Sequence, residues 1–479
     1  MLFNSLSFAV FVPVIFSIYW ALHRHNLNYQ NVVILIASYV FYGWWDWRFL
    51  ALIFVSSIVD FIVGLQLEKA SSLSFRKFLL AISLLVNLGL LGYFKYCGFF
   101  IESFVNLLHQ LDMQANNLAL QIILPVGISF YTFQTLSYTI DVYRRKMHAT
   151  KNPIAFFAFV SFFPQLVAGP IERAQSLLPQ FERKRTFDIN KANDGLRQIL
   201  WGLFKKVVIA DNLASHVDFV FGNYLELSGI ALGLGTLYFA IQIYCDFSGY
   251  SDIAIGVAKL FGFRLMRNFA FPYFSRNIAE FWRRWHISLS TWFRDYVFIP
   301  LGGSRVTRTR HIWNVMLTFA ISGLWHGSNW NFVVWGALHG FYYVIFLLVK
   351  GKKSSTQLMS GAKSENPALP SLRELSQIGI TFSMTLFAWI FFRADSVEHA
   401  LQFVRHMVTH SWLDDPGSTQ PLLFIAILLI IDWIQARKHH SLQIGWMPAW
   451  ARWAAYSTLV AIMFAYGGDK HVPFIYFQF

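Results

Sequence analysis

Charged residues are scarce in this sequence. Only 13% of its 479 residues are Asp, Glu, Lys or Arg, whereas 56% are hydrophobic. A soluble domain carries about 25% charged residues, so a chain of this size could not cover a surface that faces water. The composition excludes an ordinary cytosolic enzyme, a disordered protein and a secreted disulfide scaffold. It predicts an all-α protein that crosses a membrane several times, because a helix satisfies its own backbone groups in lipid.

Cysteine and the common metal or nucleophile motifs are also missing. Cys97 and Cys245 lie far apart in apolar surroundings, which predicts buried free thiols. The absence of H-E-x-x-H, of a Cys pair and of clustered carboxylates predicts no metal. No G-x-S-x-G elbow of a Ser-His-Asp hydrolase is present. Internal repeats and charge runs within the apolar stretches are missing too, which disfavours a transporter or a proton-coupled pump.

The charge that is present is mostly positive, with a net value of +14. In a soluble protein this would suggest nucleic-acid binding. In a membrane protein it indicates Lys and Arg in cytoplasmic loops, so we expect membrane lipid and no nucleic acid as a partner. His23, Arg24 and His25 follow the first apolar stretch. That basic flank places the N-terminus outside the cytoplasm.

About a dozen apolar stretches follow one another along the chain. Several are shorter than the roughly 20 residues that span a bilayer, so we expect some to be re-entrant. They predict one transmembrane domain over residues 1–479. Residues 350–373 are rich in Ser, Gly and Pro, which predicts a mobile cytoplasmic linker.

Residues 246–340 carry most of the candidate chemistry. They open with DFSGYSD, and nine Arg against two acidic residues lie between positions 262 and 310. This part is too polar to span lipid, so we expect short amphipathic helices at the cytoplasmic face. Its tryptophans and arginines could bind an anionic ligand, through planar guanidinium donors and flat ring faces. They could equally anchor the chain among lipid headgroups.

Two histidines in the same segment are candidate functional residues. His286 follows the Arg and Trp residues in WRRWHIS, and His326 lies in the apolar run SGLWHG. An ionisable group at membrane depth is a functional candidate, and imidazole exchanges a proton near neutral pH. The alternative is a neutral core histidine with a hydrogen bond. His339 lies in the next apolar stretch, where packing against a neighbouring helix is the simpler interpretation.

Seven blocks resemble the membrane-bound O-acyltransferase family, and within it the bacterial alginate O-acetyltransferase branch. The two most specific are FWRRWHISLSTWFRDYVFIPLGG and GLWHGSNWNFVVWGALHG. The other blocks are LPVGISFYTFQTLSYTIDVYR, FFPQLVAGPIER, IYCDFSGYSDIAIG, FFRA and the terminal FIYFQF. The resemblance runs from near the N-terminus to the last residue, without a departure in these blocks.

The resemblance implies a fold and an activity. The fold is a ring of about 11–13 transmembrane or re-entrant helices around a thin core, with a cytoplasmic and an outer funnel. The activity takes an acetyl group from acetyl-CoA, a donor substrate rather than a bound cofactor, across the bacterial inner membrane. The acetyl group then modifies an exported polysaccharide such as alginate, with a periplasmic acetyltransferase partner that completes the transfer.

The resemblance also assigns roles to residues. His326 falls on the signature histidine and would be the general base, while His286 would hold the thioester carbonyl or the leaving sulfur. Donor contacts would come from Arg283, Arg284, Arg294, Trp282 and Trp285. Supporting residues would be Asp246, Ser248, Asp252 and Asn329.

Several alternatives stay open at this point. The acceptor could be peptidoglycan or another envelope glycan. A related teichoic-acid D-alanyl transferase would take its acyl group from a carrier-protein thioester instead of coenzyme A. A transporter or an export scaffold would function without His326.

Overall fold

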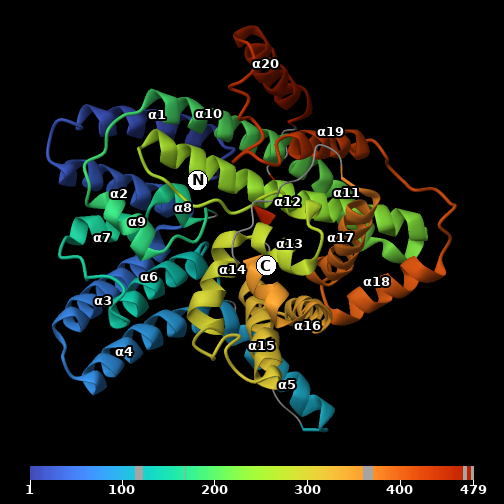
Figure 1. The fold of residues 1–479 in the computed structure, drawn as a ribbon, viewed down its shortest axis with the longest axis horizontal. Coiled ribbons are helices and arrows are strands. Elements are labelled where there is room, and N and C mark those ends of the chain that lie inside the picture. Colours follow the sequence, from blue (N-terminus) through green and yellow to red (C-terminus); the bar gives the residue numbers. More distant parts are fainter. Residues whose placement is uncertain (114–121, 168, 360–369, 468–471, 476–479) are drawn as a thin grey trace. The chain divides into compact units, whose positions relative to one another are not determined.

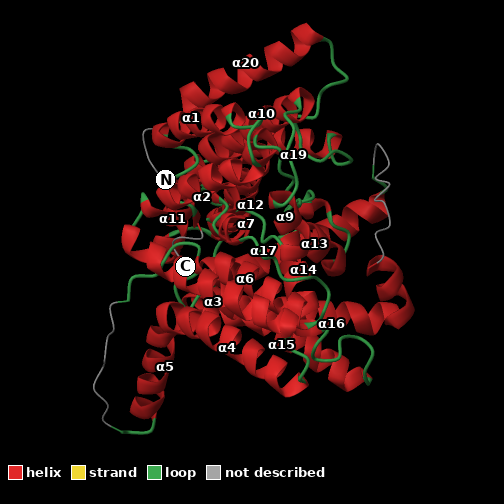
Figure 2. Cartoon of the chain, turned by 90° about the vertical axis from the view of Figure 1, so that its left-hand side faces the viewer, coloured by secondary structure: helices red, strands yellow, loops and turns green. Residues whose placement is uncertain are grey.

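The computed structural model describes residues 1–113, 122–167, 169–359, 370–467 and 472–475. Within these residues the regular structure is helical and no strand occurs (Figure 2). Contacts between Cα atoms divide the chain into two compact units. The first comprises residues 1–195 and 254–266, and the second comprises 196–253 and 267–479. The all-α class expected from the composition is confirmed.

The first unit is built mainly from the N-terminal helices, which are coloured blue to green in Figure 1. Several begin at a polar cap: the side chains of Ser5 and Asn26 accept backbone N–H groups at the starts of the first two helices. In chain order the helices are α1 (Leu6–Ala21), α2 (Leu27–Gly43), α3 (Leu50–Lys69), α4 (Leu73–Leu91), α5 (Cys97–Gln110), α6 (Ile128–Tyr143), α7 (Pro153–Val160), α8 (Phe163–Leu166), α9 (Ala174–Phe181) and the start of α10 (Ile189–Phe204).

A buried polar network joins α3, α4 and α6 of this unit. The Asp60 carboxylate accepts hydrogen bonds from Ser83 Oγ at 2.5 Å, Asn87 Nδ2 at 2.8 Å and Thr139 Oγ1 at 3.0 Å. Asp60 is fully buried. Polar side chains between apolar helices have no water to replace these bonds, so the network fixes how the three helices pack.

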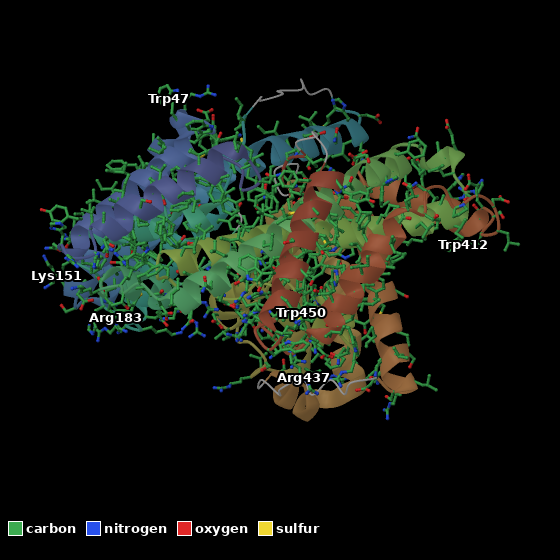
Figure 3. The ribbon with its side chains drawn as sticks, turned by 90° about the horizontal axis from the view of Figure 1, so that it is seen from above. Trp47, Lys151, Arg183, Trp412, Arg437 and Trp450 are labelled. Carbon is green, nitrogen blue, oxygen red and sulfur yellow. The ribbon has the colours of Figure 1, made fainter. Side chains whose placement is uncertain are left out.

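The second unit begins with the end of α10 and a π-helical segment at Lys205–Ala210. It carries the remaining helices, except that the last residues of α12, from 254 onward, belong to the first unit. They are α11 (Asp211–Gly222), α12 (Gly229–Leu260), α13 (Ile278–Arg284), α14 (Ile287–Phe293), α15 (Arg308–His326), α16 (Trp330–Met359), α17 (Leu372–Arg393), α18 (Val397–Thr409), α19 (Pro421–Ile434) and α20 (Ala449–Tyr466). Trp412 and Trp450, at the surface of this unit, are more than half exposed (Figure 3).

Five helical stretches of the described residues are long and apolar enough to cross a membrane, judged by length and composition. Shorter apolar helices include α1 and α19. The five are residues 47–69, 73–110, 229–260, 330–349 and 372–393. The expected polytopic membrane protein is therefore confirmed. Among the described residues, however, the helices that reach spanning length by themselves are fewer than the apolar stretches counted in the sequence.

The expected linker at 350–373 is partly helical. Helix α16 continues to Met359, and α17 starts at Leu372. Ser371 and Glu374 form a capping box at that start, each side chain binding the other's backbone N–H. Residues 360–369 lie outside the described part of the chain.

Helices α15 and α16 pack closely because two glycines face each other's backbone (Figure 1). A Cβ on Gly323 of α15 would collide with the Phe332 carbonyl oxygen, and one on Gly336 of α16 would collide with the Phe319 carbonyl oxygen. Since a backbone oxygen cannot rotate away, only glycine permits this approach. The close contact positions the end of α15 against the first turns of α16.

We predict that Gly323→Ala separates this helix pair and destabilises the protein by about 1–3 kcal/mol, the usual cost of overpacking. Gly379→Ala is a matched control, because a Cβ on that α17 glycine meets open space. The thermal unfolding midpoint of the detergent-solubilised protein should fall for Gly323→Ala and hold or rise for Gly379→Ala. Equal midpoints for the two variants would contradict the backbone collision.

Candidate active site

His286 lies in the two-residue connection between α13 and α14 of the second unit. Its backbone has φ +42°, a left-handed conformation that is costly for a residue with a side chain. The ring is completely buried, with the edge of Phe247 at 4.6 Å between centroids and Trp325 at 6.0 Å. Burial lowers the pKa of His286 from 6.5 to about 3, so the imidazole is neutral at physiological pH.

His326 is the last residue of α15 and faces His286. The two ring centroids are 6.3 Å apart, and only 3% of His326 is exposed. Trp335 of α16 contacts His326 at 5.0 Å, and Phe392 of α17 contacts it at 5.5 Å. The structure therefore brings together the two histidines that the sequence singled out, from elements 40 residues apart.

His339 belongs to the same aromatic cluster. It is fully buried on α16, with Trp335 at 4.9 Å and Trp282 at 5.0 Å. Trp335 contacts both His326 and His339. The expectation that His339 packs against neighbouring helices is confirmed.

A cavity of about 220 Å³ lies beside this cluster in the second unit. Its wall is mostly apolar, and Arg283 and Arg294 supply two cationic groups. Two lining residues place the cavity near His326. Ser322 lies one helical turn before His326 on α15, and Trp282 contacts Trp335, which in turn contacts His326. The lining residues are Ala279, Trp282, Arg283, Ile287, Ser290, Thr291, Phe293, Arg294, Phe298, Val315, Thr318, Phe319, Ser322, Tyr343 and Phe346.

The five expected donor contacts are therefore divided. Arg283, Arg294 and Trp282 line the cavity. Arg284 is turned to Glu280, with Nη2 at 2.5 Å from the carboxylate, and its side chain is 11% exposed. Trp285 is fully buried and stacks on Phe281, with 5.7 Å between centroids, so it supports the cluster from inside.

The DFSGYSD carboxylates lie on α12, each opposite a lysine of the preceding π-helical segment. Lys205 Nζ is 2.6 Å from Asp252 and donates to Ser248 Oγ at 2.7 Å. Lys206 Nζ is 2.8 Å from Asp246. These residues therefore form an internal ion-pair layer. Phe247, which follows Asp246 in the sequence, contacts His286.

Asn329 has a different environment. Its Nδ2 donates to the Asp395 carbonyl oxygen at 2.9 Å in an exposed position after α15. That bond ties the connection between α15 and α16 to the end of α17.

Three residues of the site were missed by the sequence analysis. Lys205 and Lys206 are both buried and ion-paired, although lysine usually lies at the surface. Asn268, which is fully buried, holds the ring of His286 through Nδ1 at 3.0 Å. A signal for the lysines existed, namely two adjacent cations between apolar residues and two carboxylates in a later apolar stretch.

Metal ligands do not gather around the histidines. Within the described residues, no three side chains of His, Cys, Asp or Glu come close enough to hold an ion. The cavity with its two arginines is the feature that fits a small anionic or thioester-bearing molecule.

Comparison with known proteins identifies the family of this chain. The model of the membrane-bound O-acyltransferase family matches residues 148–389, which include both histidines and the cavity. A probable alginate O-acetylase of Pseudomonas aeruginosa is 41% identical over 410 residues, covering 85% of this chain and 75% of the relative. A protein of the same name from Pseudomonas putida is 35% identical over the full length of both chains. A peptidoglycan O-acetyltransferase of Helicobacter pylori is 37% identical, covering 85% of this chain and 80% of the relative.

The chain belongs to the membrane-bound O-acyltransferase family. It is a multi-pass membrane enzyme of the acyltransferase class, with relatives named as O-acetyltransferases over most of its length.

Proposed function

We propose that this enzyme transfers an acetyl group from acetyl-CoA, through the bacterial inner membrane, for the O-acetylation of an exported polysaccharide such as alginate. The observation that carries the proposal is the buried pair His286 and His326 beside a cavity that holds Arg283 and Arg294. The N-terminus would lie outside the cytoplasm, and a periplasmic acetyltransferase would complete the transfer.

The cavity suits the donor. Its volume, about 220 Å³, is below the 300–1,000 Å³ typical of pockets for drug-sized molecules, which fits a slender pantetheine arm and a two-carbon acyl group. Arg294 pairs with Asp295 at 2.7 Å, and its side chain is 44% exposed. The donors that this pair leaves over would meet a phosphate outside the cavity while its neighbours bind the apolar arm.

The reaction needs little more than the two imidazoles. A hydroxyl oxygen attacks the thioester carbonyl, the C–S bond breaks, and the hydroxyl proton ends on the sulfur. A group that takes this proton in the transition state contributes about 10²–10⁴-fold, and a group that stabilises the carbonyl oxygen contributes about 10²–10³-fold. Two buried histidines whose ring centroids are 6.3 Å apart can divide these tasks between them.

Peptidoglycan is a second candidate acceptor, supported by the relative from Helicobacter pylori. The donor chemistry is the same in both cases. Measuring ester-linked acetyl groups in each envelope and exopolysaccharide fraction, with and without the protein, separates them. A carrier-protein thioester donor would instead show as failure of acetyl-CoA and activity with the acylated carrier.

The proposal is tested with inverted membrane vesicles, which expose the cytoplasmic face to added acetyl-CoA. We expect free-thiol release that depends on the protein. Arg283→Ala should raise KM for acetyl-CoA about tenfold, because a hydrogen bond to a charged group is worth about 1.5–3 kcal/mol, and should leave kcat near its starting value.

Arg310→Ala is the control for charge, since Arg310 is exposed and is not one of the residues that line the cavity. No thiol release from acetyl-CoA in any polymer-producing strain would overturn the proposed donor. An unchanged KM in Arg283→Ala would instead remove the arginine from the donor site.

A further inference from the structure

Another cavity, of about 190 Å³, lies in the first unit and has a strongly basic wall. The last turn of α1, the segment between α9 and α10, the first turn of α10 and the end of α12 enclose it. We call it the basic pocket. Five cationic residues and one acidic residue line it, so it attracts anions. The lining residues are Trp20, Gln180, Arg183, Lys184, Arg185, Thr186, Asp188, Lys191, Lys259 and Gly262.

Two of the five cations already have a carboxylate partner. Lys191 Nζ lies 3.4 Å from Asp188, and Lys259 Nζ lies 2.5 Å from Asp194. The Asp188 carboxylate also accepts the backbone N–H groups of residues 190 and 191 at the start of α10. The acidic group of the pocket is therefore fully engaged, and it does not neutralise the other cations.

The remaining cations are Arg183, Lys184 and Arg185, and none of them forms an ion pair within the described part of the chain. Arg183 and Lys184 are exposed, and Figure 3 shows Arg183 at the surface. Charges of one sign that gather in a concave surface add their fields together. The pocket therefore has a positive potential that the described residues leave uncompensated.

Arg185 lines the pocket from inside and is only 6% exposed. Its Nη1 donates to the Gln180 carbonyl oxygen at 3.1 Å, its Nη2 donates to Asn31 Oδ1 at 2.7 Å, and the ring of Phe263 lies 4.7 Å from the guanidinium carbon. These three partners are neutral, so they orient the guanidinium without cancelling its charge. A buried charge is costly without a counter-charge, and an anion in the adjoining pocket would lower that cost.

Apolar side chains lie next to these cations. Phe187 packs against Trp20 at 5.3 Å and Phe16 at 5.9 Å on α1, yet it stays 48% exposed. Ile189, the first residue of α10, is 59% exposed. Cations next to exposed aromatic and aliphatic side chains are typical of a surface at the level of lipid headgroups. A soluble phosphate would leave these apolar groups unused.

We propose that the basic pocket binds the phosphate of an anionic phospholipid headgroup. Arg183 and Lys184 contact the phosphate oxygens, Arg185 contributes its charge from the inner wall, and the acyl chains lie beside Phe187 and Ile189. A phosphodiester carries one negative charge and several acceptor oxygens, which suit a guanidinium fork and an ammonium group. The basic pocket shares no lining residue with the cavity beside the histidines, so this lipid site is distinct from the candidate active site.

Thermal unfolding of the full chain in a neutral detergent tests the site, because a ligand that binds only the folded protein raises the unfolding midpoint. The probes are phosphatidylglycerol, phosphatidylcholine and inorganic phosphate, each titrated into protein that detergent exchange has freed of bound lipid. We expect phosphatidylglycerol to raise the midpoint more than phosphatidylcholine does, and inorganic phosphate to leave it unchanged.

The double variant Arg183→Gln with Lys184→Gln should bind phosphatidylglycerol at least about tenfold more weakly, because it loses two charge-assisted contacts. Both side chains are exposed, so their replacement leaves the core packing intact. Arg308→Gln with Arg310→Gln is the matched control. It removes the same charge from two exposed positions that do not line the pocket, and it should bind the lipid as wild type does.

Equal affinity of the wild type and the Arg183 and Lys184 variant for phosphatidylglycerol would overturn the inference. An equal shift with phosphatidylcholine would also overturn it, because it would show that the apolar surface alone binds lipid. An equal shift with inorganic phosphate would assign the pocket to a soluble anion instead. The same holds for acetyl-CoA, if it raises the midpoint of the wild type and not that of the Arg183 and Lys184 variant.

Discussion

His326→Ala is expected to lower acetyl transfer at least 100-fold at matched membrane levels. The ring is nearly fully buried and faces His286. Trp335 contacts this ring and also contacts Trp282, which lines the cavity. Removing either a proton acceptor or a donor to the carbonyl oxygen costs about 10²–10⁴-fold and about 10²–10³-fold respectively. The large loss is therefore expected for either role of this imidazole.

The ester-linked acetyl content of each polymer fraction, measured by NMR, checks this in cells. Cells without the protein and cells with His326→Ala should lose acetyl esters from the same polymer, which identifies the acceptor. Full acetylation in His326→Ala cells, with loss in the deletion, would show that the protein is needed as a scaffold or carrier and that His326 is not catalytic.

His326→Gln separates the two roles. Glutamine keeps an N–H donor but is not a base. If His326 holds the thioester carbonyl, Gln should retain measurably more activity than Ala. If His326 is the base, as the family resemblance implies, the Gln and Ala variants should be equally inactive.

The membrane class and the histidine pair could both be predicted from the sequence. A charge fraction of 13% excludes a water-facing surface whatever the topology. His286 and His326 stand in motifs whose residue types already suggest proton chemistry, and the structure places them 6.3 Å apart. The arginines that line the cavity, Arg283 and Arg294, were likewise recognisable as candidates because Arg and Trp alternate there in an otherwise apolar chain.

The residues that hold these side chains in place could not be predicted, because they act through contacts between segments that are distant in the sequence. Asn268 reaches His286 across 18 residues, and nothing in the local pattern pairs that extended segment with the start of α14. The burial of Lys205 and Lys206 could not be foreseen either, because lysine is rarely buried without a partner. Their partners are Asp252 and Asp246, more than 35 residues further along the chain.

Lys206→Met is expected to destabilise the second unit by about 3–5 kcal/mol, the usual cost of removing one partner from a buried ion pair. Lys206 is 1% exposed and lies 2.8 Å from both Asp211 and Asp246. Methionine would fill much of the same volume, but it would leave two carboxylates buried without their cation. Burial already raises the pKa of Asp211 to about 7, so this carboxylate would have to protonate to remain inside.

The same ion pairs hold the segment 472–475, and through it the site. Lys206 Nζ donates to the Val472 carbonyl oxygen at 3.2 Å, and Asp246 accepts the Ile475 N–H at 2.7 Å. Phe474 then packs on Phe247 at 5.7 Å, and Phe247 packs on His286. Lys206→Met should therefore reduce acetyl transfer even in the fraction of protein that remains folded.

Thermal unfolding of the solubilised protein and thiol release per folded molecule test the two effects separately. Lys191→Met is the control, because Lys191 pairs with Asp188 at 3.4 Å with its side chain 70% exposed, and such pairs contribute little. An unchanged midpoint in Lys206→Met would show that the buried charges are compensated elsewhere. A lowered midpoint with full activity per folded molecule would separate the ion-pair layer from the orientation of His286, and Phe247 would then be held by its helix rather than by the segment 472–475.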